Sequence, residues 1–195
     1  MAFDKQTIDK IPELGVAIAD LYVEGFSAPP WNEIWTRESA LEELARAAQK
    51  DCFVGVFAYE PEIEDIAGFS WGYKLPTKRQ GRVDFETSCA NLLQKGISPS
   101  QVFYGADTVV REKFRGQGLA KKLVYARTGD CPERYVCFRT KNEPMLKAYR
   151  SVFGKEITSF VENSAYDGGR MYVFRTSFPI ADLHVPDPLF SGCLR

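Results

Sequence analysis

The chain has 195 residues, of which 45% are hydrophobic and 26% are charged, and its formal net charge is -1. These values are typical of a globular protein that buries a sizeable core, and the length predicts a single domain over 1–195. A net charge near zero gives no overall attraction to nucleic acid or to an anionic membrane, so the composition argues against both partners.

Targeting segments and cysteines further restrict the class of protein. The N-terminal residues lack a basic stretch followed by an apolar one, and no apolar run has the length of a membrane-spanning helix. The five cysteines are odd in number and contain no CxxC pair, which argues against a zinc site and a disulfide framework. We therefore expect a cytoplasmic protein with reduced thiols and no bound metal.

The first third of the chain predicts two helices and a hairpin. Apolar residues recur at helical spacing over 8–24, and Pro12 places the start of the regular helix near that residue. A loop rich in proline and tryptophan follows, after which Thr36 is a suitable N-cap for a second helix. The short apolar runs 52–59 and 66–73 then predict the two strands of a hairpin.

The remainder alternates between strands and helices after a polar excursion. Residues 74–101 contain one predicted helix near 88–95, and an excursion of this size is commonly functional or mobile. Gly105, within the next strand, indicates a bulge or a close backbone approach. The predicted order is strand 102–110, helix 118–128, strand 135–139, a helix capped by Asn142, strands near 156–161 and 170–176, and an irregular tail from about 179. This order favours a layered α/β or α+β sheet.

Two glycines lie where strand 102–110 meets the following helix. Gly116 and Gly118 are too close together for a P-loop, and a dinucleotide-binding GxGxxG would need glycine where Lys121 stands. The first amides of a helix have no intrahelical partner and carry a partial positive charge, so they can hold a phosphate if no bulky side chain blocks the approach. The alternative is an ordinary turn with solvated lysines, and the glycines alone leave both possibilities open.

The order of residues around these glycines is more specific. The run Arg115-Gly116-Gln117-Gly118-Leu119-Ala120 resembles the acyl-CoA pyrophosphate loop of the GNAT N-acetyltransferases, whose pattern is Gln/Arg-x-x-Gly-x-Gly/Ala. Asn142 followed by Ala148-Tyr149 matches the spacing on a later helix of that family. The resemblance covers most of 8–175, most closely 102–153. It implies an α/β (α+β) fold with a mixed, mostly antiparallel central sheet that is flanked by helices and splayed between strands 102–110 and 135–139.

The resemblance also implies how acetyl-CoA, as co-substrate, would bind. The backbone of 108–110 would pair with the pantetheine amides in the gap of the sheet, the N–H groups of 116–121 would hold the pyrophosphate, and Asn142 would reach the cofactor arm. The cofactor-binding candidates are therefore Thr108, Val109, Val110, Arg115, Gly116, Gln117, Gly118, Leu119, Ala120, Lys121 and Asn142.

Two catalytic candidates follow. Tyr149 matches the general acid of the family, and a phenol can protonate a departing thiolate, whose thiol has a pKa of about 8.5, at little cost. The alternative for Tyr149 is a core aromatic. The positions of the family's glutamate bases fall at Tyr104 and Cys137, neither of which is a carboxylate. Asp107, on the strand next to the splay, is the leading substitute, and a structural hydrogen bond is its alternative role.

Several other residues are weaker candidates around the acceptor site. We expect Glu33, Asp84 and Glu86 to be solvated surface charges, and the single histidine, His184, lies in the tail. Aromatic and proline residues could bind a flat or cationic amine or simply pack together; they are Pro29, Pro30, Trp31, Trp35, Trp71 and Tyr73. Compared with the family, a first strand is missing or confined to residues 1–6, and the helix of Tyr149 ends in a reversed Phe153-Gly154 order.

The resemblance predicts an N-acetyltransferase that moves an acetyl group from acetyl-CoA to a primary amine by direct attack in a ternary complex. The acceptor is a small-molecule or peptide amine, and the sequence does not identify it. The missing glutamates support an alternative, a non-catalytic acyl-CoA-binding sensor or partner-binding module on the same fold. An exposed edge formed by the last two strands could support a homodimer.

Overall fold

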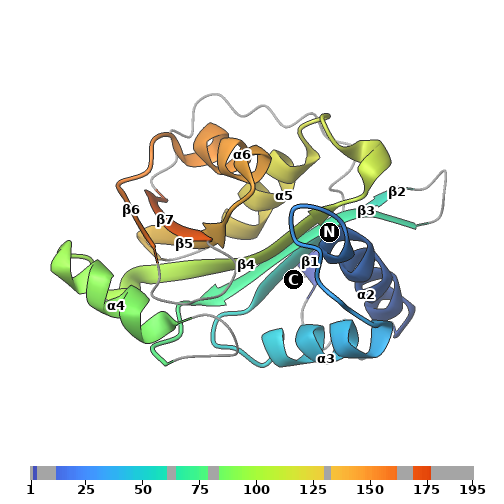
Figure 1. The fold of residues 1–195 in the computed structure, drawn as a ribbon, viewed down its shortest axis with the longest axis horizontal. Helices are drawn as coiled ribbons and strands as arrows, with labels where there is room; N and C mark the ends of the chain where they lie inside the picture. The colour runs from blue at the N-terminus through green and yellow to red at the C-terminus, as the bar shows by residue number, and fades with distance from the viewer. Residues whose placement is uncertain are drawn as a thin grey trace.

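A central sheet of seven strands runs through the computed structural model, which describes residues 2–3, 12–60, 65–78, 84–129, 133–161 and 169–176 (Figure 1). The strands are β1 (Ala2–Phe3), β2 (Val54–Glu60), β3 (Asp65–Lys74), β4 (Val102–Val110), β5 (Tyr135–Thr140), β6 (Thr158–Val161) and β7 (Arg170–Arg175). Their order is β1-β2-β3-β4-β5-β7-β6, and only β4 and β5 pair in parallel. The predicted mixed, mostly antiparallel sheet is confirmed.

Helices cover both faces of this sheet. They are α2 (Pro12–Ser27), α3 (Arg37–Ala47), α4 (Phe85–Gln94), α5 (Leu119–Thr128) and α6 (Glu143–Phe153). Figure 1 shows α2 and α3 on one face and α5 and α6 on the other. No helix in the described ranges is long and apolar enough to cross a membrane, and the same ranges contain no cluster of three or more His, Cys, Asp or Glu side chains suited to a metal ion.

The residues at the helix ends explain where three of the helices begin or end. Thr36 is the N-cap of α3, where its hydroxyl accepts a hydrogen bond from the Ser39 amide at 3.2 Å and the Ser39 hydroxyl accepts one from the Thr36 amide at 3.0 Å. The helix α4 begins three residues before the predicted start at 88, because the Asp84 carboxylate caps it by accepting from the Thr87 amide at 3.0 Å. Gly154 ends α6 with φ 78° and ψ -149°, a conformation that favours glycine.

The remaining predicted elements lie close to the expected bounds. The two residues of β1 pair with β2, which confirms a first strand confined to residues 1–6. Part of the 74–101 excursion belongs to the core, since Leu75 and Phe85 are buried. Strand β6 is the last in the sheet order, so the last two strands of the chain form an edge of the sheet, as expected. A dimer through this edge stays a prediction. The tail from 179 and the beginning of the predicted 8–24 helix lie outside the described residues.

The sheet opens between β4 and β5. The two strands pair only from Val102 opposite Tyr135 to Gly105 opposite Phe138, while β4 continues for five more residues. On its other side β4 pairs with β3, where Trp71 lies opposite Asp107 and Gly72 opposite Gly105, so Ala106 is an extra residue. The predicted splay is confirmed, and the bulge lies at Ala106, one residue beyond the glycine that suggested it.

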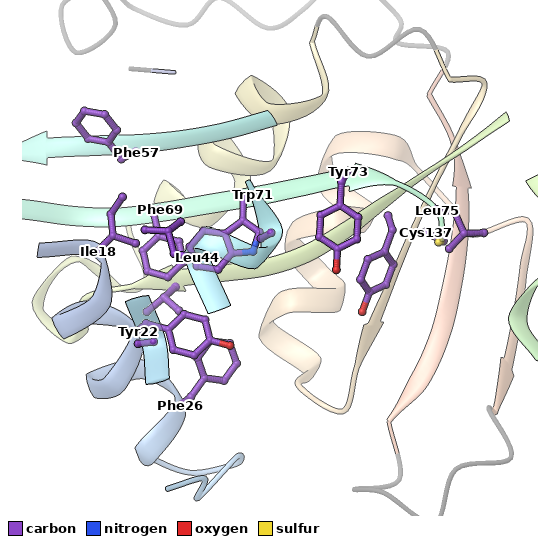
Figure 2. Packing of buried hydrophobic residues seen from close by; sticks show 14 of the residues in the cluster. Ile18, Tyr22, Phe26, Leu44, Phe57, Phe69, Trp71, Tyr73, Leu75 and Cys137 are labelled. Atoms are coloured by element: carbon purple, nitrogen blue, oxygen red, sulfur yellow. The ribbon is translucent and has the colours of Figure 1, made fainter. Parts of the chain in front are cut away.

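Aromatic side chains fill the layer between α2 and the sheet. The Trp71 ring stacks on Phe69 at 4.6 Å and on Tyr22 at 5.7 Å between centroids, and Figure 2 shows the three rings together beneath the strands. Trp71 has no solvent exposure, and Tyr73 is buried against Tyr104. For Trp71 and Tyr73, the structure supports core packing over a place in the acceptor pocket.

Candidate active site

A wide cleft of about 600 Å³ occupies the opening between β4 and β5. One wall is the end of β4, and the opposite wall is the start of α6 with Asn142. Further lining comes from the loop before α5 and from the loop after α2. The predicted residues that line it are Thr108, Val109, Val110, Arg115, Ala120, Asn142, Pro29, Pro30 and Trp31. The cleft thus brings together most of the cofactor-binding candidates.

The glycine loop presents open backbone beside this cleft. Gly116 and Gly118 have φ of 78° and 77°, values in the left-handed region, and a Cβ added to either would meet nothing within 4 Å. Gly118 is the N-cap of α5 and provides no side-chain cap for the amides that follow. An anion can therefore approach the start of α5 without a side chain in the way, as the sequence motif predicted.

The long side chains of the loop fold back onto it. The Arg115 Nε donates to the Val110 carbonyl at 2.9 Å, and the Gln117 amide nitrogen donates to the Lys113 carbonyl at 3.1 Å. Leu119 packs against the apolar cluster beneath α5, and Lys121 is half-buried. The bond of Arg115 joins the loop to the end of β4, so it links two parts of the cleft wall.

A smaller cavity of about 170 Å³ adjoins the cleft. Thr108 and Asn142 line both spaces. Tyr149 and Asp107 line only the inner cavity, so the structure brings the two catalytic candidates together from α6 and β4. Asn142 is the N-cap of α6, but its side chain makes no capping hydrogen bond. We refer below to these two spaces as the cleft and the inner cavity.

Tyr149 is held in place on two sides. Its ring stacks on Phe138 with 3.5 Å between centroids, and its hydroxyl accepts a hydrogen bond from the Arg127 guanidinium at 2.5 Å. Burial raises the pKa of the Tyr149 phenol above its ordinary value, while the charge and the hydrogen bond of Arg127 act in the opposite direction. The phenol therefore stays protonated at neutral pH and is available as a proton donor.

Asp107 has an environment suited to accepting a proton. The residue keeps some solvent exposure, yet its pKa is raised to about 8, chiefly by burial of the carboxyl group and also by the nearby Glu43 and Glu33 carboxylates. The Trp71 indole lowers that pKa as a donor toward the carboxylate, although its geometry falls short of a regular hydrogen bond. Arg127 also lowers it. A carboxylate with this pKa can act as a general base near neutral pH.

The other predicted acids have different positions. Tyr104 and Cys137, at the positions of the family's glutamates, are buried neighbours on β4 and β5. Asp84 caps α4, Glu86 is exposed, and His184 lies outside the described residues. Glu33 is not a solvated surface charge as expected: it is half-buried, lines the inner cavity and accepts a 2.7 Å hydrogen bond from the Trp35 indole. The loop folds back onto α2 here, where the Glu33 amide donates to the Phe26 carbonyl at 2.9 Å.

Sequence reasoning missed Arg127. Its side chain is only 1% exposed and contacts the Tyr149 hydroxyl from α5. A signal was present in the sequence, since Arg127 follows Leu123 by four residues and therefore falls on the apolar face of that helix. A charged residue at such a position requires polar partners inside the protein.

The comparisons with solved structures agree with the fold. The protein PH1933 from Pyrococcus horikoshii OT3 is 16% identical, with a TM-score of 0.59 over 91% of this chain and 99% of its own. A GNAT-family acetyltransferase from Streptococcus pneumoniae is 13% identical, with a TM-score of 0.53 over 90% and 96%. A mutant spermidine N-acetyltransferase from Vibrio cholerae is 9% identical, with a TM-score of 0.50 over 90% and 93%. At these identities the likeness shows the fold alone.

No curated protein sequence matches the chain. The model of the acetyltransferase (GNAT) family, however, matches residues 16–154, which include both walls of the cleft and the inner cavity. The chain therefore belongs to the GNAT acetyltransferases, enzymes that use acetyl-CoA as the acetyl donor.

Proposed function

We propose that the protein transfers the acetyl group of acetyl-CoA to a primary amine by direct attack, and that the reacting atoms meet in the inner cavity. The observation that carries this proposal is the common lining of that cavity by a phenol and a carboxylate, Tyr149 and Asp107, next to the cleft. A general acid and a general base are the two groups that amide formation from a thioester requires.

The cleft has the features that acetyl-CoA needs. The end of β4, at 108–110, has no β5 partner and can offer its backbone groups to the pantetheine arm. The amides of 116–121 can offer donors to the pyrophosphate, and the space around Gly116 and Gly118 is open. The side chain of Asn142 makes no capping hydrogen bond. It lies at the junction with the inner cavity, where it can contact the pantetheine arm.

Protons then move between the chain and the reactants. Acetyl-CoA supplies a thioester carbonyl that is activated toward amines. Asp107 accepts a proton from the ammonium form of the acceptor and later releases it to solvent, which leaves a neutral nitrogen to form the carbon–nitrogen bond. When the carbon–sulfur bond breaks, the electron pair of that bond passes to sulfur. Tyr149 gives its hydroxyl proton to this sulfur. The second proton that the nitrogen loses restores the phenol.

The inner cavity also favours a class of acceptor. Glu33 places a carboxylate on its wall, Asp107 adds a carboxyl group that ionises near pH 8, and aromatic rings come from Tyr22, Trp31 and Tyr104. Such a surface attracts a cation both through charge and through the faces of the rings. A volume of about 170 Å³ suits the reactive end of an aliphatic amine. We infer that the acceptor is a small-molecule or peptide amine that arrives as a cation with an unbranched reactive arm.

The competing function is an acyl-CoA-binding module without catalysis, which the replacement of both family glutamates by Tyr104 and Cys137 favours. One experiment separates the two. Free-thiol release from acetyl-CoA is followed with a panel of amines that includes a diamine, a polyamine, an amino-acid amide and an aminoglycoside. Amine-dependent release supports the acetyltransferase. Binding of acetyl-CoA without release from any amine supports the module, and absence of binding contradicts both.

A further inference from the structure

The buried arginine on α5 has no role in the mechanism described so far. Arg127 is 1% exposed, and the hydrogen bonds that it donates within the described part of the chain go to neutral oxygen atoms. Nη1 donates to the Ser70 hydroxyl at 2.8 Å and to the Trp71 carbonyl at 3.2 Å, and Nη2 donates to the Tyr149 hydroxyl. Burying a guanidinium without a carboxylate as hydrogen-bond acceptor is costly, so a functional reason for it is expected.

The backbone is shaped to admit this contact. Gly105 lies beside the meeting point of the two side chains, and a Cβ at that position would collide with the Tyr149 hydroxyl and with the Arg127 guanidinium. The glycine that the sequence marked for a close approach is thus the residue that lets Arg127 reach Tyr149 from the other helix. Contacts of the guanidinium with the rings of Phe103 and Tyr149, at 5.9 and 5.6 Å, complete its surroundings.

The chemistry of the pair sets the direction of the hydroxyl. A guanidinium has five N–H donors and no acceptor, so the Tyr149 oxygen must accept and its own hydrogen must point elsewhere. Phe138 covers the face of the tyrosine ring, and the inner cavity lies beside the residue. The hydrogen is therefore available to a group inside that cavity.

We propose that Arg127 is a positioning residue for the acid step: it orients the Tyr149 hydroxyl toward the inner cavity and stabilises the phenolate that remains after proton donation. This inference rests on the proposed function, because it assigns Tyr149 the role of proton donor. A charged donor at hydrogen-bond distance stabilises an anion more strongly than a neutral one, especially where water is excluded.

The first test observes Tyr149 directly and needs no turnover. The protein, with its nine tyrosines, is labelled with 3-fluorotyrosine, and Tyr149→Phe identifies the fluorine resonance of residue 149. The other titratable groups that act on this hydroxyl are Cys137 on β5 and Asp107 on β4, and both are present in every protein compared. In Arg127→Met the resonance should titrate at least about one pH unit higher than in the wild type, because the cation no longer favours the phenolate.

Two further variants keep this test decisive. Arg127→Gln retains a donor but not the charge, so it replaces Arg127→Met if that variant does not fold. It should shift the titration midpoint in the same direction. Ser70→Ala removes another partner of Arg127 without touching the bond to Tyr149, so its midpoint should equal that of the wild type. Equal midpoints in the wild type and in the charge-removing variants, or no titration in any of them, would overturn the proposal.

Kinetics supply the second readout. Arg127→Met should lower kcat by about 10- to 100-fold and leave the KM for acetyl-CoA unchanged, and the double variant with Tyr149→Phe should be no slower than Tyr149→Phe alone. Losses that multiply in the double variant would mean that Arg127 acts independently of Tyr149, which contradicts the inference. A shifted fluorine midpoint without turnover for any amine would instead count against the proposed function and leave the pairing of Arg127 and Tyr149 intact.

Discussion

The cleft and the inner cavity adjoin each other, yet they are built from different kinds of groups. The cleft presents the unpaired end of β4 and the amides at the start of α5, beside two glycines with left-handed backbone. The inner cavity presents side chains from α6, β4 and the loop after α2, with a phenol and a carboxylate among them. Under the proposed function, backbone donors serve binding and ionisable side chains serve proton transfer, so variants in the two regions should affect different quantities.

The largest effect is expected at Gly105, which lines the inner cavity. The methyl group of Gly105→Ala would occupy the space in which Arg127 and Tyr149 meet, and overpacking of this kind costs about 1–3 kcal/mol of folding free energy. Displacement of the Tyr149 hydroxyl should lower kcat by about 10²-fold, the scale of general acid catalysis. Thermal melting and steady-state kinetics measure the two effects.

A matched control uses a glycine that has room for a methyl group. At Gly129, at the end of α5, an added Cβ would meet only the Tyr125 and Ala126 carbonyls, at 3.6 and 3.8 Å, and the backbone is already helical. Gly129→Ala should keep the kcat of the wild type and its stability, within about 1 kcal/mol. If Gly105→Ala behaves like this control, the crowded contact is not needed for catalysis.

Asp107→Asn tests the base in the same cavity. The substitution should lower kcat by about 10²-fold. Because the pKa of Asp107 is raised to about 8, kcat/KM of the wild type should rise with pH and level off near pH 8, and this limb should be missing from the variant. If the rise reflected ionisation of the amine, its midpoint pH would change when amines of different basicity are compared. A rise due to Asp107 keeps the same midpoint pH for every amine. A pH profile that is identical in both proteins would remove Asp107 from the role.

Asp107→Asn, which should lower activity, should raise the stability of the folded protein. A carboxyl group whose pKa is raised on folding binds its proton more tightly in the folded state, so its contribution to stability is lost as the pH rises from about 4 to about 8. Asp107→Asn should therefore increase the free energy of unfolding above pH 8, by about 1–3 kcal/mol, and leave it unchanged below pH 4. Denaturant unfolding at the two pH values measures this difference.

The smallest effect is expected in the cleft. Gly118→Ala places an L-residue in the left-handed region, which costs roughly 1–2 kcal/mol unless the loop shifts. A shifted loop moves the amides at the start of α5, so the Kd for acetyl-CoA should rise by about 10-fold while kcat at saturation stays constant. Gly96→Ala, after α4, introduces the same strain at φ 72° away from both cavities and should leave Kd unchanged. Equal Kd values in both variants would contradict a role for the loop.

Local patterns explain which parts could be predicted. The cap at Thr36, the strand over 102–110 and the glycine loop each depend on a few consecutive residues, so periodicity and capping chemistry were sufficient. The splay could be predicted only through the family resemblance, because the end of pairing at Gly105 depends on two strands that are far apart in the sequence.

The inner cavity depends on tertiary contacts that no short pattern encodes. Glu33 lines it because a loop folds back onto α2, and the pKa of Asp107 is raised by burial and by the carboxylates of Glu43 on α3 and of Glu33. Arg127 reaches Tyr149 from another helix across Gly105. Its place on an apolar helical face was visible in the sequence, but the oxygen atoms that accept its hydrogen bonds were not.

The division between a binding cleft and a reactive inner cavity is tested most directly with Tyr149→Phe. The Kd for acetyl-CoA and the amine-dependent release of thiol are measured on the same preparation, beside the wild type. We predict a Kd within about twofold of the wild-type value and a kcat lower by about 10²-fold or more, since only the proton donor is removed. An unchanged kcat, or a loss explained entirely by weaker binding of acetyl-CoA, would contradict the account.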